Sequence, residues 1–195
     1  IDINHATKSW LGLNSSTILE PMVKLYKLTN NQKYFDFATY IIDEGGCSKY
    51  NLIELAYENK VLPYQYGVSK AYEMMSCYVG LLELYKITGK EEYLEATKRT
   101  VRSIIDTEIN IAGSGAAFEC WFGGKERQTL PAYHTMETCV TFTWMQICDR
   151  LLSLTGNALL ADEIERTMYN ALMASFKGDA SQISKYSPLE GWRAP

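Results

Sequence analysis

Residues 80–104 read GLLELYKITGKEEYLEATKRTVRSI, and this stretch contains the pattern that decides the fold of the chain. An apolar helical stripe ends in Ile-Thr, and the next residue is Gly89, which tolerates the left-handed conformation in which many helices end. After a short polar turn, apolar residues return at helical spacing, among them Tyr93, Leu94 and Ala96. The stretch therefore predicts a helical hairpin, that is, two helices joined by a tight turn.

Two other stretches repeat this pattern. The first, at residues 20–42, reads EPMVKLYKLTNNQKYFDFATYII, and the second, at residues 148–172, reads CDRLLSLTGNALLADEIERTMYNAL. Asn30 and Gly156 take the place of Gly89 at the two turns. A two-helix unit that recurs along a chain indicates repeated helical hairpins. We expect helices at residues 16–29, 31–43, 66–88, 91–107, 135–154 and 158–175.

Successive hairpins of this kind form either an open superhelix or a closed toroid of paired helices. We expect an all-α fold in which residues 1–195 make up about half of an (α/α)6 toroid, that is, a closed ring of six helical hairpins. Neither end of the sequence resembles a natural terminus, so we expect the chain to be a fragment of a longer protein.

Composition excludes several classes of protein. The chain has 195 residues, 47% of them hydrophobic, and a net charge of −4, which gives no sign of a nucleic-acid or membrane-surface partner. No apolar run approaches the roughly 20 residues of a membrane span. The 5 cysteines fit no disulfide framework, so reduced thiols are expected.

Residues 132–142, AYHTMETCVTF, place an acid and a thiol two positions apart. With Thr135 as the N-cap, Glu137 would lie in the first turn of a helix, where the helix dipole favours an acid without any function. Cys139 would then be a small apolar residue of the helical stripe. Alternatively, the carboxylate and the thiolate are both metal ligands, a combination that suits Zn²⁺. Two residues at this spacing do not share a helix face, so the second interpretation requires a bend or a helix end there.

Acids elsewhere in the sequence also allow two interpretations. Glu119 has apolar and aromatic neighbours in GAAFECWFGG, residues 115–124, and such poorly hydrated surroundings favour the neutral carboxyl that a general acid needs. It could equally be a loop residue that points to water. Glu163 and Glu165 are two positions apart on a predicted helix, so they project differently and we expect one of them to face solvent. This polar helix could line a sugar cleft or simply face water.

The ordered motifs LPAYHTMETC, LTGNALLADEIERTMYNALMAS and YSPLEG resemble the β-L-arabinofuranosidases of glycoside hydrolase family 127 and their relatives. The resemblance extends over nearly the whole chain. It implies a bacterial carbohydrate-metabolising hydrolase with an α/α toroid followed by β-sandwich domains. It also implies a retaining mechanism, in which the nucleophile is a Cys thiolate held on Zn²⁺.

Carried over motif by motif, the resemblance assigns five site residues. Glu137 and Cys139 match the zinc ligands, and Glu119 matches the general acid/base. Glu165 and Tyr186 match residues that contact the sugar, so a carbohydrate substrate is the expected partner.

The family's Cys-Cys pair, which includes the nucleophile, lies downstream of the Pro-Leu motif and beyond Pro195. We therefore expect this chain alone to be inactive and to bind no zinc. Two other classes compete with this interpretation. One is a different α/α-toroid carbohydrate enzyme, of the epimerase or unsaturated uronyl hydrolase type; the other is a non-catalytic helical-repeat binding module.

Overall fold

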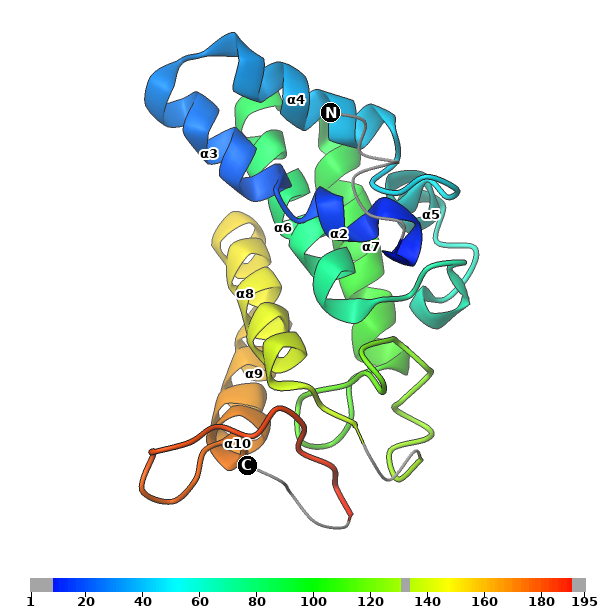
Figure 1. The fold of residues 1–195 in the computed structure, drawn as a ribbon, viewed down its shortest axis with the longest axis vertical. Coiled ribbons are helices and arrows are strands. Elements are labelled where there is room, and N and C mark those ends of the chain that lie inside the picture. The colour runs from blue at the N-terminus through cyan, green and yellow to red at the C-terminus, as the bar shows by residue number, and fades with distance from the viewer. Residues whose placement is uncertain (1–8, 131–133, 191–195) are drawn as a thin grey trace. The chain divides into compact units, whose positions relative to one another are not determined.

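The structure is a computed structural model of the chain, and it describes residues 9–130 and 134–190 (Figure 1). Within these two ranges the regular elements are all helical, and strand-like pairing is limited to isolated β-bridges. The all-α prediction is therefore confirmed. The chain divides into two compact units, residues 1–102 and residues 103–195, and each is described by itself. None of the described helices has the length and apolar character that a membrane span requires.

The first unit is built around α3, which packs against both α4 and α6. Its elements are η1 (Ser9–Gly12), α2 (Leu13–Ser16), α3 (Leu19–Thr29), α4 (Gln32–Asp43), α5 (Leu52–Glu58), η2 (Pro63–Gln65), α6 (Ala71–Thr88) and the first part of α7 (Glu91–Thr107). A Cβ atom at Gly80 of α6 would lie 2.6 Å from the Leu19 side chain, so the close approach of α6 to α3 depends on this glycine.

The second unit contains a hairpin of two packed helices, α8 and α9, which lie side by side in Figure 1. After the end of α7, its elements are α8 (Thr138–Thr155), α9 (Ala158–Thr167), the π-helical segment η3 (Met168–Leu172) and α10 (Met173–Ser175). Trp144 and Leu151 of α8 and Leu160 of α9 are buried. The α8–α9 hairpin therefore has an apolar core.

The three predicted turns are confirmed, and they share one set of hydrogen bonds. The residue after each Ile-Thr or Leu-Thr pair has positive φ, at 52°, 67° and 66° for Asn30, Gly89 and Gly156. In each turn the Thr hydroxyl donates to the carbonyl four residues earlier, at 2.7–2.9 Å, and accepts from the backbone N–H two residues later, at 3.3 Å. The threonine thus provides an acceptor for an N–H that lies just beyond the helix end, and adds a second donor to a carbonyl of the last turn.

Three predicted helix starts differ from the structure, and one helix was not predicted. The helix expected from residue 16 begins at Leu19, after the separate short helix α2. The helix expected from residue 66 begins at Ala71, because Tyr66 and Lys70 have extended backbones. The helix expected from residue 135 begins at Thr138, because Met136 has a φ of 51°, which a right-handed helix cannot contain. Helix α5 was not predicted. It begins after Asn51, whose side chain accepts hydrogen bonds from the first turn, and it is only 7 residues long.

The helix expected at 158–175 is present over that whole range, with a π-helical turn, η3, inside it. The backbone N–H of Ala171 donates to the carbonyl of Ala112, which lies outside the helix, at 3.1 Å. Diverting one N–H from the helical ladder accounts for the π-helical turn at η3.

Candidate active site

Three backbone segments of the second unit pair with one another and bring the predicted residues together. The segments are 116–120, 134–138 and 184–187, and isolated β-bridges link 117 to 135 and 137 to 186. Backbone hydrogen bonds of 2.9–3.0 Å join them: Phe118 N to His134 O, Thr138 N to Lys185 O, and Ser187 N to Thr135 O. The middle segment therefore lies between the other two, and it leads directly into α8.

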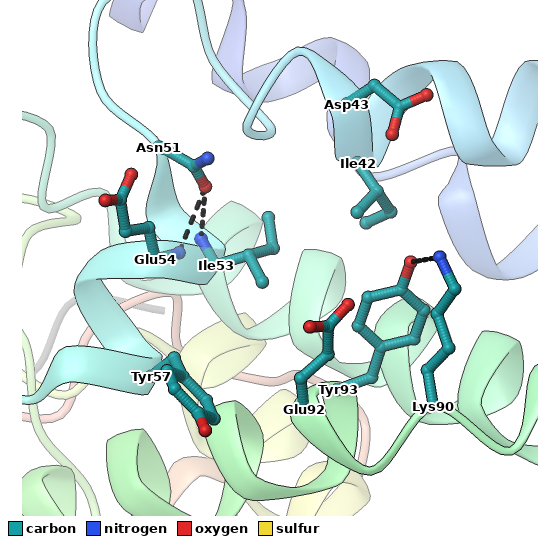
Figure 2. Close-up of a pocket in the computed structure, with 9 residues that line it drawn as sticks. All are labelled: Ile42, Asp43, Asn51, Ile53, Glu54, Tyr57, Lys90, Glu92 and Tyr93. Atoms are coloured by element: carbon teal, nitrogen blue, oxygen red, sulfur yellow. Dashed lines mark hydrogen bonds between the residues drawn. The ribbon is translucent and has the colours of Figure 1, made fainter.

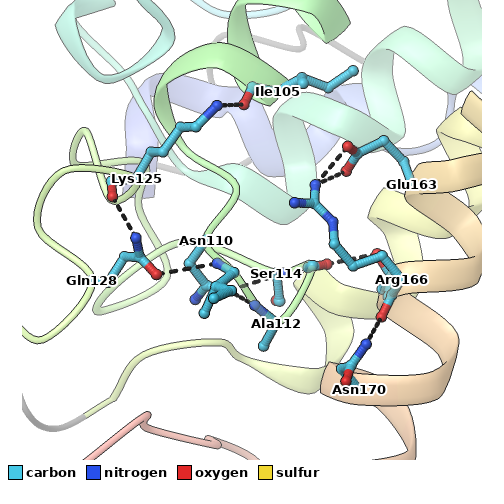
Figure 3. Close-up of polar contacts among 12 residues, drawn as sticks. Ile105, Asn110, Ala112, Ser114, Lys125, Gln128, Glu163, Arg166 and Asn170 are labelled. Carbon is cyan, nitrogen blue, oxygen red and sulfur yellow. Dashed lines mark hydrogen bonds and ion pairs between the residues drawn. The ribbon is translucent and has the colours of Figure 1, made fainter. Parts of the chain in front are cut away.

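The first of these segments belongs to a long loop that is held from both sides. Glu108 is fully buried, and its Oε2 accepts the backbone N–H groups of residues 122–124 at 3.0, 2.9 and 3.2 Å. Figure 3 shows further anchors, in which Lys125 Nζ donates to Ile105 O at 3.1 Å and Gln128 Oε1 accepts from Ile111 N at 3.1 Å. The loop that carries Glu119 is therefore well ordered by its own polar contacts.

Glu119 and Glu137 lie on either side of a single ammonium group. Lys185 Nζ is 3.6 Å from Glu119 Oε1 and 3.5 Å from Glu137 Oε1. Glu137 is nearly buried, whereas the Glu119 side chain is 32% exposed. Contact with the Tyr186 side chain, and then the charge of Glu137, raise the pKa of Lys185 above its ordinary value. Two predicted acids are thus brought to one place, together with a cation that was not predicted.

Glu137 and Cys139 lie on the two sides of a helix start. Glu137 occupies the N-cap position with extended backbone (ψ 132°), whereas the exposed Cys139 is in the first turn of α8. This is the bend that a shared metal would require at that spacing. The prediction that Thr135 caps this helix is wrong, because Thr135 lies before the left-handed residue Met136 and is buried.

The donor chemistry of Glu137 and Cys139 fits zinc, but these two residues do not close a site. Within residues 9–130 and 134–190, no group of three or more His, Cys, Asp or Glu side chains could hold a metal ion. A structural zinc site needs four ligands and a catalytic one needs three. The described part of the chain therefore supplies part of a ligand set.

Three rings follow one another beside the carboxylates. The ring centroids of Tyr186 and His134 are 4.6 Å apart, and those of His134 and Phe118 are 5.1 Å apart with an edge-on geometry. Lys185 Nζ lies 5.0 Å from the centroid of the Tyr186 ring. Tyr186, which was predicted, is thus joined by His134 and Phe118, which were not.

The backbone around these residues is unusual for its sequence. Phe118, Glu119, His134 and Met136 all have positive φ, at 47°, 70°, 51° and 51°. For a residue with a Cβ atom this conformation costs about 1–2 kcal/mol. Glycine or asparagine would have marked such positions in the sequence, and neither is present, so the sequence contained no signal for them.

The two acids of α9 behave differently. Glu163 is buried and forms an ion pair with Arg166, shown in Figure 3, whereas Glu165 is exposed. The prediction that one of the two faces solvent is confirmed. Contact of Glu165 with a sugar stays a prediction.

Three buried thiols, those of Cys47, Cys77 and Cys148, are poorly suited to nucleophilic attack. Cys77 and Cys148 are fully buried, and burial raises the pKa of the Cys77 thiol to about 12 and that of Cys148 well above its ordinary value. The thiolate is the reactive form, so neither residue is a good nucleophile. Cys47 is also buried, with a raised pKa for the same reason.

A pocket of about 410 Å³ lies in the first unit, away from these segments in sequence. Figure 2 shows that it lies among α4, α5 and the start of α7, where Lys90 Nζ donates to the Tyr93 hydroxyl at 3.2 Å. Its carboxylates, Asp43, Glu54 and Glu92, are exposed. None of the five predicted site residues lines this pocket.

Comparison with known proteins gives one family and a group of related structures. The profile of the family described as the β-L-arabinofuranosidase, GH127 catalytic domain, matches residues 5–194. No curated protein sequence matches the chain.

Several solved structures resemble the chain, and three of them are described here. A GH127 β-L-arabinofuranosidase from Geobacillus stearothermophilus is 21% identical, with a TM-score of 0.70 over 90% of this chain and 31% of that one. A GH127 β-arabinofuranosidase is 26% identical, with a TM-score of 0.69 over 89% of this chain and 28% of that one. A protein described as a glycoside hydrolase is 19% identical, with a TM-score of 0.69 over 95% and 34%. This chain therefore spans about a third of the length of these structures, and its fold is of their α/α-toroid class, as expected.

Proposed function

We propose, on the premise that this chain belongs to the β-L-arabinofuranosidase GH127 catalytic-domain family, that it is the acid/base-bearing part of a retaining glycoside hydrolase. The observation that supports this most directly is the meeting of Glu119 and Glu137 at Lys185, beside the ring of Tyr186. A partly exposed carboxyl such as that of Glu119 can supply the general acid/base that cleavage of a glycosidic bond requires. The proposed substrate is a β-L-arabinofuranoside.

Glu119 is proposed as the general acid/base. It protonates the oxygen of the leaving group as the glycosidic bond breaks, and later takes a proton from the water that completes hydrolysis. Its partial exposure, 32%, gives water and substrate access to the carboxyl, while the anchored loop fixes its position. Tyr186 and Glu165 are proposed to contact the sugar.

Glu137 and Cys139 are proposed to hold Zn²⁺ in the complete gene product. When bound, the ion would keep a neighbouring thiol deprotonated and would make that thiolate a better leaving group. Glu137 is suited to binding a cation because it is nearly buried, and the interaction between its carboxylate and a neighbouring cation is stronger there than in water. The nucleophilic thiol itself is proposed to come from sequence after Pro195, since burial disfavours the thiolates of Cys77 and Cys148.

The test is the substitution Glu119→Gln in the complete gene product. Turnover of an aryl β-L-arabinofuranoside should fall by about 10²–10⁴-fold, the usual contribution of a general acid/base. Zinc content should not change. Glu126→Gln, on an exposed residue of the same loop, is the matched control and should retain turnover. Unchanged turnover in the Glu119 variant would remove this residue from the mechanism.

Zinc analysis separates this proposal from its competitors. A metal-independent toroid enzyme or a binding module predicts no retained zinc in the complete gene product. The present proposal predicts retained zinc that is lost in a Glu137→Ala, Cys139→Ala double variant. For residues 1–195 alone, it predicts neither hydrolysis nor tight zinc binding.

A further inference from the structure

We propose that Phe118 and His134 form a stacking surface for the leaving group of the substrate. Together with Tyr186, which adjoins His134 and is proposed above to contact the sugar, they are called here the ring row. The ligand would be a group with a flat apolar face, that is, a second sugar ring or an aryl ring. The proposal rests on the proposed function, because it assigns the leaving group to the side of the site that bears Glu119.

The ring row is continuous with the carboxylates. Starting from Glu119 Oε1, the contacts run to Lys185 Nζ at 3.6 Å, from there to the Tyr186 ring at 5.0 Å, and on to the His134 ring at 4.6 Å. The last ring, Phe118, is 5.1 Å from His134 and adjoins Glu119 in sequence. The row therefore begins at the lysine that lies between the two carboxylates and ends at the residue that precedes Glu119 in sequence, so it is not a separate surface patch.

The three rings are more exposed than aromatic side chains that serve only to fill the core. Phe118 is 55% exposed, His134 is exposed, and Tyr186 is half-buried. The buried aromatic residue of the same loop, Trp121, already fills the core there. Removing Phe118 or His134 would therefore sacrifice little buried apolar surface, and stability alone does not explain why the rings are present.

The backbone that presents two of the rings is strained. Phe118 and His134 both adopt positive φ, which costs about 1–2 kcal/mol for each non-glycine residue. Strain of this kind is concentrated at functional sites, where surrounding structure holds a side chain in a required place. Here the holding contact is the hydrogen bond from Phe118 N to His134 O, at 2.9 Å, which fixes the two strained residues against each other.

The choice of the leaving group follows from the chemistry of Glu119. A general acid must lie within hydrogen-bonding distance of the leaving oxygen, so the rest of the leaving group lies on its side of the bond. Phe118 is the adjacent residue, and its ring is turned toward His134. Aromatic faces bind the C–H face of a sugar or the plane of an aryl group through burial and ring geometry, without requiring charge.

The experiment compares two substrates of the complete gene product, 4-nitrophenyl β-L-arabinofuranoside and β-L-arabinofuranosyl fluoride. Only the first has a ring in its leaving group. The variants are Phe118→Asn and His134→Asn, since asparagine tolerates positive φ and should leave the backbone unchanged. Each should lose about tenfold more kcat/KM on the aryl substrate than on the fluoride. His134→Phe should restore the ratio, and Phe176→Ala, on an exposed ring of the same unit, should not change it.

Two kinetic outcomes overturn the proposal. If both substrates lose activity equally, the rings support the carboxylates and do not bind the leaving group. If neither substrate is affected, the rings have no role in the reaction.

A binding measurement distinguishes failure of this proposal from failure of the proposed function. Saturation-transfer NMR with 4-nitrophenyl β-L-arabinofuranoside should show stronger transfer to the aryl protons than to the sugar protons, and Phe118→Asn should abolish that excess. If the protein hydrolyses neither substrate but shows this pattern, the ring row stands and the proposed function fails. Absence of aryl contact in the unmodified protein overturns the ring row, whatever the activity.

Discussion

Removal of the Glu108 carboxylate should loosen the loop that carries Glu119. The side chain is fully buried, and one of its oxygens accepts three backbone N–H groups, those of Phe122, Gly123 and Gly124, at 2.9–3.2 Å. Each hydrogen bond to a charged acceptor contributes about 1.5–3 kcal/mol to stability. Because the three donors share one oxygen, the lower end applies to each, and Glu108→Ala should cost about 4 kcal/mol.

Glu108→Gln gives a graded test of the same reasoning. The amide oxygen can still accept the three N–H groups, but without the negative charge, so we expect a loss of about 1–2 kcal/mol. Gln128→Ala removes two neutral hydrogen bonds at a partly exposed position of the same loop, and it should cost about 1–2 kcal/mol, less than Glu108→Ala. The assay is urea denaturation followed by circular dichroism, with the free energy of unfolding compared among the variants.

A free-energy loss below about 1 kcal/mol for Glu108→Ala would refute this reasoning, because three N–H donors left without their acceptor should cost more than that. A loss for Glu108→Gln as large as that for Glu108→Ala would refute the assignment of the effect to hydrogen bonding. If Glu108→Ala does not fold, the glutamine variant alone tests the reasoning. A loss of about 1–2 kcal/mol supports the assignment to hydrogen bonding, and a loss of about 4 kcal/mol contradicts it.

Three further predictions test other contacts. Gly113→Ala should lower the free energy of unfolding by about 2–4 kcal/mol, because the φ of Gly113 is +84° and the new Cβ would lie 2.7 Å from the backbone of α9. Gly178→Ala, with open space around the new Cβ, should have little effect in the same denaturation assay. Thr155→Val should lower the free energy of unfolding by about 1 kcal/mol, measured from the shift in melting temperature, since it removes both hydrogen bonds of the Thr155 hydroxyl. In the folded protein, the exposed Cys139 should react quickly with a disulfide reagent, and the buried Cys77 should react only after unfolding. Burial raises the pKa of Cys77 from 9.0 to about 12, so between these pH values the thiol ionises in the unfolded chain but not in the native one. The free energy of unfolding should therefore fall as pH rises through that interval.

The hairpins could be predicted from the sequence because each turn depends on residues that are close together in the chain. A left-handed residue such as Gly89 and an apolar stripe are local signals, and they gave the helix ends on both sides of each turn. Local signals failed where the start of a helix depended on a distant contact. The start of α8 is displaced to Thr138 because the preceding residues pair with segments 116–120 and 184–187.

The same distinction applies to the site. Glu119, Glu137 and Tyr186 were predicted from ordered motifs, and the structure places them around one cation. Lys185 and His134 were not predicted, because a single lysine and a single histidine have many roles and no local pattern distinguishes these two. Their positions follow from contacts across about 50 residues of sequence, as in the approach of His134 to Tyr186.

The pairing of residues 134–138 with residues 184–187 also determines when the site can form during synthesis. Helices α8 and α9 leave the ribosome before the 184–187 segment does, and they can pack as soon as both are available. Until segment 184–187 has been synthesised, Glu137 lacks its β-bridge partner, Tyr186. The segment that completes this pairing contains Lys185. The pairing therefore also places the Lys185 ammonium group between Glu119 and Glu137.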